Sequence, residues 1–411
     1  MEHGGVGKPG SLDVEGYLAD SGGEMRRLAA EHWYADGLDL SGQPMPMVLG
    51  YDEVRQTLRD RRLSARSFTD DMLASGISEE TAFQLTPLFR RDGDEHRRHR
   101  ALLAAAFTPR SIERLRPVAA AIAARLADAI AEVGVASGGS ASVDFVPAFA
   151  APLPPEVFAV LFGLPVTDRD RLGRWATAVA KAFTPAPDAG AVADIERAAA
   201  ELRAYTRDLI AERRSHPADD LVTGLLVADL DGERLDDDEI VATISGFIFA
   251  GAETTRNQLM EMVVAFAEHP DQWNRVVADP QRIPGAVEEV LRHRGIVPAL
   301  TRAVVEPFEQ DDLEVDVGGR LLVSFVTANH DGGHFGGPET FAIDRANAGD
   351  HVSFGWGPHF CLGAGLARVE LQESLRALSA RFEPPEVDPE RFTAATMGWS
   401  DSLPVVWTER A

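Results

Sequence analysis

The hydrophobic positions of the chain recur mainly every three to four residues, which is the period of an amphipathic helix. Ala- and Leu-rich stretches with this period predict helices over residues 95–106, 109–133, 154–161, 168–181, 191–215, 221–228, 270–277, 284–292 and 362–375. Short alternating runs at 301–326 and 403–407 are expected to form strands. The pattern predicts a mainly α protein of the α+β class with a minor β-sheet region.

One predicted helix is longer and more apolar than the others. Asp236, Asp237 and Asp238 place negative charge where a helix begins, and residues 239–268 contain few helix breakers before Pro270. The first half of this run, IVATISGFIFAGA, is apolar on every side. A helix without a polar face must be buried, so we expect it to cross the middle of the fold.

The N-terminal part of the chain is less regular. Residues 1–10 are rich in glycine and are expected to be flexible, whereas 45–50 and 51–59 predict a strand followed by a helix. Residues 63–91 mix Ser, Thr, Asp and aromatic residues and are too long for an ordinary loop, which favours a binding segment. Because no repeat or polar linker divides the chain, we expect one domain over residues 1–411.

Composition and charge exclude several classes of protein. The chain has 411 residues, 45% of them hydrophobic, with 40 basic and 65 acidic residues and a net charge of -25. This acidity argues against binding to nucleic acid or to anionic membranes. One cysteine excludes an intramolecular disulfide, and no stretch resembles a signal peptide or a membrane anchor. We therefore expect a cytoplasmic, monomeric protein.

The single cysteine, Cys361, lies in the stretch HVSFGWGPHFCLGAGLAR, directly before a predicted helix. A lone cysteine is most often a small buried side chain. Here Gly355, Gly357 and Gly363 allow tight turns and a close approach of the backbone to a flat ligand. Backbone N–H groups at the start of the helix are expected to lower the pKa of the thiol and favour the thiolate, the form that binds metal.

This stretch resembles the haem-binding loop of cytochrome P450s. Phe354, Gly357, Cys361 and Gly363 fit the pattern F-x-x-G-x-x-x-C-x-G, and residues 366–368 are similar to those of the soluble bacterial members. The resemblance implies a P450 fold with the long central helix over haem b, iron protoporphyrin IX. It makes Cys361 the axial thiolate ligand of the iron. Phe354 is then expected to pack beside the sulfur, and Gly363 to leave room for N–H donation to it.

A second motif lies in the middle of the long helix, as Ala250-Gly251-Ala252-Glu253-Thr254-Thr255. Two structural explanations exist: Thr254 could bond back to the carbonyl of Ala250, and Gly251 could be a packing site. The residues nevertheless resemble the P450 signature A-G-x-[D/E]-T-T. The resemblance implies that Ala250 and Gly251 border the haem, that Thr254 supplies a hydrogen bond in oxygen activation, and that Glu253 relays protons.

Glu289 and Arg292 resemble the E-x-x-R pair of P450s, which supports the cysteine loop and performs no chemistry. On a helix surface such a pair would contribute only a few tenths of a kcal/mol. A third member is expected from the segment FAIDR, with Arg345 as the candidate. The preceding segment departs from the family's usual A-N-R-D-P, because it has His330 for Arg and Gly332 for Pro.

The Gly-rich segment ANHDGGHFGG contains two histidines, His330 and His334. They could be read as metal ligands. Because no third ligand is evident, we expect solvated loop histidines instead.

Haem carries two propionates, so an acidic protein needs local cations to bind it. His96 and Arg100 are four residues apart on one face of a predicted helix, and they resemble the H-x-x-x-R of P450s. Arg302 and His359 match the two other positions that reach the propionates in the family. Any one of these residues alone is more often a surface charge.

By this resemblance, the protein is a haem-thiolate monooxygenase that takes electrons from a separate ferredoxin and ferredoxin reductase. A peroxide-driven peroxygenase is the alternative within enzymes, and a haem-based binding or sensor protein is the alternative outside them. The segments that line the substrate site in the family are rich in Ala, Phe, Leu and Pro, which predicts a mostly apolar small-molecule substrate. They are residues 63–89, 176–192, 246–249, 296–300 and 399–402.

An acidic ferredoxin needs a locally basic face on this acidic chain. The helical period turns Arg97 and Arg98 away from the proposed propionate contacts, and Arg110, Arg114 and Arg116 follow closely. We expect this group to meet the electron donor. The alternative is that these arginines pair with neighbouring acids.

Overall fold

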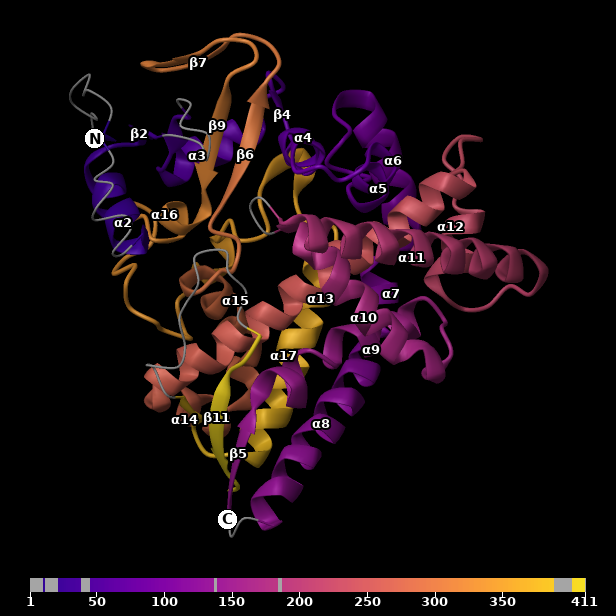
Figure 1. Ribbon diagram of the computed structural model, residues 1–411. Coiled ribbons are helices and arrows are strands. Elements are labelled where there is room, and N and C mark those ends of the chain that lie inside the picture. Colours follow the sequence, from indigo (N-terminus) through magenta and orange to yellow (C-terminus); the bar gives the residue numbers. More distant parts are fainter. Residues whose placement is uncertain are drawn as a thin grey trace.

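The computed structural model describes residues 10–11, 21–37, 45–136, 139–183, 187–387 and 401–410. Figure 1 shows a body of helices, with one sheet at its upper end and a smaller one at its lower end. The long helix α13 runs through the centre. The mainly helical architecture predicted from the hydrophobic pattern is therefore confirmed.

Helix α13 spans Asp237–Glu268 and begins within two residues of the predicted start. Asp236 and Glu239 form a capping box there, in which each side chain accepts a hydrogen bond from the other residue's backbone N–H. The helix is buried along most of its length and packs against α5, α9, α10, α11 and α17. Its apolar first half thus forms the middle of the core, as expected.

Most of the other helices lie in the helical body with α13, whereas α2, α3 and α16 lie beside the main sheet, and the helix bounds agree with most predicted ranges. They are α2 (Ser21–Glu31), α3 (Tyr51–Thr57), α4 (Ser67–Ala74), α5 (Glu79–Leu85), α6 (Gly93–Ala106), α7 (Pro109–Glu113), α8 (Arg116–Ala136), α9 (Leu153–Leu161), α10 (Arg169–Ala180), α11 (Ala189–Ser215), α12 (Leu221–Val227), α14 (Pro270–Ala278), α15 (Ile283–His293), α16 (Phe325–Asn329) and α17 (Ala364–Arg381).

Two predicted segments differ from the structure. The helix expected over 109–133 is two helices, α7 and α8, because Pro117 at the start of α8 lacks an N–H and cannot continue a preceding helix. The irregular segment expected over 63–91 contains the short helices α4 and α5. Ser78 caps α5 by accepting a hydrogen bond from the N–H of Thr81.

The strands form three small sheets. The largest has the order β1-β2-β3-β9-β6-β4, with β6 antiparallel to β9. A second sheet has the order β10-β11-β5, and β7 pairs with β8 as a hairpin. The strand bounds are β1 (Gly10–Ser11), β2 (Tyr34–Asp36), β3 (Met47–Val48), β4 (Leu63–Ser64), β5 (Ser140–Asp144), β6 (Ala299–Val304), β7 (Phe308–Gln310), β8 (Leu313–Val315), β9 (Arg320–Ser324), β10 (Glu386–Val387) and β11 (Pro404–Thr408).

The buried apolar side chains fall into a large cluster around α13 and two smaller ones at the main sheet. The larger of these two joins Tyr51 and Val54 of α3 to Val323 of β9 and Phe325 of α16. It fixes α3 and the main sheet relative to each other. Among the described residues, no helix has both the length and the apolar character that crossing a membrane requires.

Candidate functional site

The cysteine loop is a tight turn followed by a helix. The N–H of Cys361 donates to the carbonyl of Phe354 at 2.9 Å, which closes the loop. Gly355 and Gly357 have φ angles of 72° and 74°, in the left-handed region that side chains with a Cβ avoid. Helix α17 begins three residues after the sulfur, close to the predicted position.

Cys361 has accessible surface, although it lies deep within the protein. Burial raises the pKa of its thiol, while the N–H groups of Gly363 and Ala364 and the guanidinium groups of Arg100 and Arg368 act in the opposite direction. The prediction that the start of the helix lowers the pKa of the thiol is therefore wrong for the protein alone. The effect of burial on this pKa is larger than that of the N–H and guanidinium groups. The Cys361 sulfur is thus surrounded by protein atoms and still accessible to a bound group.

Two loop residues that the motif singles out, Gly363 and Phe354, have defined surroundings. A Cβ added to Gly363 would lie 3.9 Å from the Cys361 sulfur, at ordinary contact distance. Phe354 packs on the core, with the guanidinium of Arg368 4.7 Å from its ring centre. Arg368 is held in turn by Glu288 at 2.7 Å. The groups that interact with the sulfur are therefore backbone N–H groups and two guanidinium groups, and none of them is an acid.

On α13, the side chains of Glu253 and Thr254 have different surroundings. Glu253 is 5% exposed and its carboxylate pairs with Arg256 at 3.0 Å. Thr177 of α10 donates to the same carboxylate at 3.5 Å, and Asp401 approaches Arg256 at 3.4 Å. Burial raises the pKa of Glu253, Arg256 opposes this and Asp401 adds to it. An acid with a raised pKa and few hydrogen bonds can both take up and release a proton.

The two structural explanations for the α13 motif both describe contacts that are present. The Thr254 hydroxyl donates to the carbonyl of Ala250 at 2.5 Å. A Cβ added to Gly251 would lie 2.4 Å from the ring of Phe158, so the absent side chain makes room for that ring. Gly251 is therefore a packing site, because the ring of Phe158 occupies the space that a side chain at this position would need. Thr254 keeps accessible surface and the free lone pairs of its oxygen.

The four predicted cation positions are near neighbours: His96 interacts electrostatically with Arg100 and His359, and Arg302 with Asp92. The rings of His96 and His359 are 4.0 Å apart, and His359 contacts the Asp92 carboxylate at 3.1 Å. The Nε2 atom of His96 is buried without a partner, and burial lowers its pKa to about 4. Arg302 is 5% exposed, and burial lowers its pKa to about 10. Within the described chain, neither Arg302 nor Arg100 forms an ion pair with a carboxylate.

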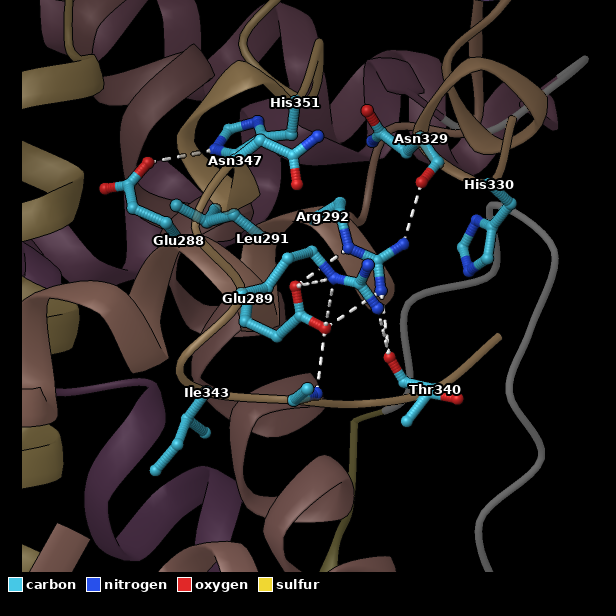
Figure 2. Close-up of polar contacts among 12 residues, drawn as sticks. Glu288, Glu289, Leu291, Arg292, Asn329, His330, Thr340, Ile343, Asn347 and His351 are labelled. Atoms are coloured by element: carbon cyan, nitrogen blue, oxygen red, sulfur yellow. Dashed lines mark hydrogen bonds and ion pairs between the residues drawn. The ribbon is translucent and has the colours of Figure 1, made fainter. Parts of the chain in front are cut away.

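Glu289, Arg292 and Arg345 form a buried clamp, of which Figure 2 labels Glu289 and Arg292. Two nitrogens of Arg292 contact the Glu289 carboxylate at 2.8 and 2.9 Å, and Arg345 contacts it at 3.1 Å. Arg292 also donates to the carbonyls of Asn329 and Thr340. The contact of Arg345 is the one predicted for the third member. Asn329 extends the clamp to the cysteine loop, because its amide oxygen accepts from the N–H of Val352 at 2.8 Å.

The prediction of two solvated loop histidines is wrong for His330. Burial lowers the pKa of His330, its Nδ1 contacts the carbonyl of Val326 at 2.9 Å, and its ring lies 5.5 Å from that of His293. His334 stacks on Tyr51 with ring centres 3.7 Å apart. Both rings serve local packing. The described residues contain no group of three His, Cys, Asp or Glu that could hold a metal ion.

Sequence reasoning missed three residues around the site. Arg256 and Asp401 set the charge around Glu253, and Asp92 orients His359. Arg256 could have been found, because it follows Glu253 by three residues on a predicted helix. Nothing in the local sequence indicates Asp92 or Asp401, whose contacts join distant segments.

The comparisons with known proteins agree with this geometry. A family model described as cytochrome P450 matches residues 24–398. The chain belongs to the cytochrome P450 family. This P450 is 33% identical to luteothin monooxygenase of Streptomyces thioluteus, over 87% of each chain. It is 34% identical to steroid C26-monooxygenase of Mycolicibacterium smegmatis, over 78% of this chain and 79% of the relative.

Solved structures show the same fold. The histidine-tagged, open cytochrome P450 Eryk from S. erythraea superposes with a TM-score of 0.79 at 31% identity, covering 96% of this chain and 97% of that one. The ligand-free P450 TbtJ1 gives a TM-score of 0.81 at 32% identity, covering 98% and 100%. The predicted fold is confirmed, and the protein is a P450 monooxygenase, an oxidoreductase whose family carries a haem iron.

The residues of this chain fit a haem. Cys361 offers an accessible sulfur ligand, and a bound metal cation would deprotonate the thiol whose pKa burial raises. Arg302 and the unpartnered Nε2 of His96 are buried and Arg100 is half-buried, and none of them has an acid partner in the described chain. Two propionates would satisfy these groups.

Proposed function

We propose that this P450 holds haem b through Cys361 and inserts one oxygen atom of O2 into a mostly apolar small organic substrate. The second oxygen atom leaves as water, with two protons and with two electrons from a separate ferredoxin and its reductase. We also propose one domain over residues 1–411, acting as a cytoplasmic monomer. The observation that carries the proposal is the accessible Cys361 sulfur, which interacts with the guanidinium of Arg100, a cation without a carboxylate partner in the described chain.

Each residue around the haem has its own role in the proposal. Phe354 and Gly363 shape the space around the Cys361 sulfur, and the Gly363 N–H moderates its charge. The propionates bind to His96, Arg100, Arg302 and His359, and Asp92 fixes the His359 ring. Haem bound through a thiolate supplies the oxidising chemistry and favours cleavage of the O–O bond.

Glu253 and Thr254 deliver protons on the cavity side of α13. The Thr254 hydroxyl proton is engaged by the carbonyl of Ala250, so the oxygen's lone pairs can accept a hydrogen bond from a group in the cavity. Glu253 exchanges protons with solvent, because its raised pKa lies nearer to neutrality than that of a free carboxyl. Arg256 holds the carboxylate in place meanwhile.

An apolar substrate is supported by the aromatic residues of the predicted wall segments. Phe68, Phe89, Phe183 and Phe249 contact one another, with ring centres 5.5 Å apart for Phe68 and Phe89 and 4.2 Å apart for Phe183 and Phe249. They join three wall segments that are distant in sequence. The names of relatives, such as steroid C26-monooxygenase, also point to apolar compounds. The wall residues 184–186, 399 and 400 lie outside the described part of the chain.

The first test is the spectrum of the reduced protein with CO. Wild type is expected to show the red-shifted Soret band of thiolate ligation, and Cys361→Ala is expected to lose it. A thiolate-type band that persists in the variant would overturn the proposal. Substrate turnover with O2, NAD(P)H, ferredoxin and reductase then distinguishes the alternatives. Product with peroxide alone would indicate a peroxygenase, and O2 binding without NAD(P)H consumption would indicate a sensor.

A further inference from the structure

The arginines expected from the sequence to meet the electron donor pair with acids of the same chain. Arg98 contacts Glu233 at 2.6 Å, and Arg114 contacts Asp219 at 3.0 Å. The alternative of internal pairing is therefore observed for four members of that group, which are Arg97, Arg98, Arg114 and Arg116. Their charges are balanced within the chain.

Arg26 of α2 has a weaker partner. Its Nε atom lies 3.5 Å from the carboxylate of Glu339, a side chain that is 60% exposed. The guanidinium makes no hydrogen bond to a described residue. A surface contact of this length contributes little to stability, so most of the donor capacity of Arg26 is available to a ligand.

A cavity of about 280 Å³ lies beside Arg26, between α2, the end of α15 and α16. Among the described residues, six side chains with charged or imidazole groups line it: Arg26, Arg292, His293, Arg294, His330 and Glu339. Five of these six are arginines or histidines, on a protein whose net charge is -25. The acids that pair with Arg292 and Arg294 are not part of this lining, so nitrogen groups border most of the cavity.

The two imidazole rings in the lining are neighbours, with ring centres 5.5 Å apart. The Nδ1 atom of His330 lies 2.9 Å from the carbonyl of Val326, so this nitrogen carries the hydrogen in the neutral ring. The Nε2 atom of His330 then presents a lone pair and makes no hydrogen bond to a described residue. The Nδ1 atom of His293 is buried without a partner.

The electrostatic potential at these rings is positive. Burial lowers the pKa of His293 to about 3, and its cationic or imidazole neighbours His330, Arg292, Arg294 and His269 lower it further. His330 is faced by Arg26 of α2 and Arg292 of α15, which lower its pKa, and by Glu339, which raises it. An anion placed between Arg26 and His330 would reverse this effect and allow the ring to take up a proton.

We propose that this cavity binds a small organic acid, whose carboxylate contacts Arg26 and His330 and whose apolar part lies against Val297 and Val326. Both valines line the cavity. Because a carboxylate cannot donate to the Nε2 lone pair of His330, one proton from solvent binds to this nitrogen together with the acid. Charge-assisted hydrogen bonds from a guanidinium and an imidazolium then hold the carboxylate.

This site is separate from the proposed haem site. Of the segments expected to line the substrate site, only 296–300 reaches the cavity within the described chain, through Val297. Asn329 also lines the cavity, and Figure 2 shows it next to Arg292 and His330. Its amide oxygen accepts from the N–H of Val352, and its amide nitrogen donates to Ser353 at 2.8 Å. A ligand in the cavity is therefore expected to stabilise the clamp and, through Asn329, the segment that leads to the cysteine loop.

The test is calorimetric titration of the holoenzyme with butyrate at about pH 6 and about pH 8. Wild type is expected to bind butyrate severalfold more tightly at the lower pH, because binding takes up a proton. Arg26→Gln should weaken binding at least about fivefold at both pH values, since it removes a charged donor. His330→Gln should remove the pH dependence. Arg114→Gln makes the same charge change away from the cavity, on a side chain that is 60% exposed, and should leave the affinity unchanged.

A second measurement follows the Soret absorbance of the holoenzyme in urea. Butyrate is expected to move the midpoint of its loss to higher urea in wild type and not in Arg26→Gln, because a ligand stabilises the state that binds it.

Equal butyrate affinities of wild type and Arg26→Gln would overturn the site, and so would an affinity of wild type that does not change with pH. Inorganic sulfate that binds as tightly as butyrate would overturn the apolar contact with Val297 and Val326. A shift of the Soret band with butyrate that is the same in wild type and Arg26→Gln would place the acid at the haem and overturn the proposal. The CO spectrum of the wild type tests the proposed function separately.

Discussion

This P450 contains two buried pairs, each made of a glutamate and an arginine at the same spacing, whose surroundings differ. Glu289 with Arg292, and Glu253 with Arg256, are both three residues apart on a helix. Glu289 receives two nitrogens of Arg292, the Nε of Arg345 and the N–H of Ala342. Glu253 receives only Arg256 and a long contact from Thr177 within the described chain. The number of donors, not the spacing, distinguishes a fixed clamp from an acid that can exchange protons.

The clamp is expected to show the largest effect on stability. Arg292→Ala leaves the buried Glu289 without its main partner, and the unfolding free energy should fall by about 3–5 kcal/mol. Urea unfolding of the holoenzyme measures the change. Arg282→Ala is the matched control, because Arg282 pairs with acids at a surface where such a pair contributes less than about 1 kcal/mol. Similar losses of unfolding free energy in the two variants would contradict the distinction between the buried clamp and a surface ion pair.

Glu253 is expected to matter for turnover rather than stability. Glu253→Gln keeps the size of the side chain but removes the exchangeable proton, so product formation per second should fall about 100-fold or more. Substrate affinity and the CO spectrum should remain unchanged. Turnover within a factor of two of wild type would remove Glu253 from the proton path and leave its ion pair as a structural feature.

The raised pKa of Glu253 also predicts a pH dependence of stability. The folded pKa lies above the unfolded one, so the native state binds more protons between the two values. The stability from this group is complete below the unfolded pKa and is lost as the pH rises through the folded pKa. Comparison with Glu253→Gln isolates this contribution from that of Glu370, another buried acid whose pKa burial raises. If the stability of wild type relative to Glu253→Gln increased with rising pH, the raised pKa of Glu253 would be contradicted.

Arg256→Gln should shift that pH dependence upward. Arg256 lowers the pKa of Glu253, so its removal raises the pKa further and moves the midpoint of the stability difference to higher pH. The pH–rate profile of turnover should move in the same direction. A downward shift would mean that Arg256 does not stabilise the Glu253 carboxylate.

The sequence predicted those parts of the site that lie within one segment. The cysteine loop, the α13 motif and the Glu289–Arg292 pair each occupy a few consecutive residues, and Arg345 was found from its segment FAIDR. Contacts between distant segments were not predictable. The acids that pair with Arg98 and Arg114 lie more than 100 residues away in sequence, and so does the Leu58 carbonyl that packs against Gly357.

Asp401 provides the smallest test of the comparison. Its side chain is 92% exposed and contacts Arg256 at 3.4 Å. The Asp401 carboxylate therefore competes with the Glu253 carboxylate for the same guanidinium group. Asp401 also raises the pKa of Glu253. Asp401→Asn removes both effects, and the midpoint measured for Arg256→Gln should move the other way, to lower pH. Because the carboxylate of Asp401 is solvated, the shift of the midpoint should be smaller than that of Arg256→Gln and should shrink with added salt.

Opposite shifts in the two variants would show that a buried cation lowers the pKa of Glu253 and a surface anion raises it. Glu289, whose carboxylate accepts from four donor groups, has no such surface anion among its contacts. Shifts in the same direction would mean that Asp401 acts only by orienting Arg256.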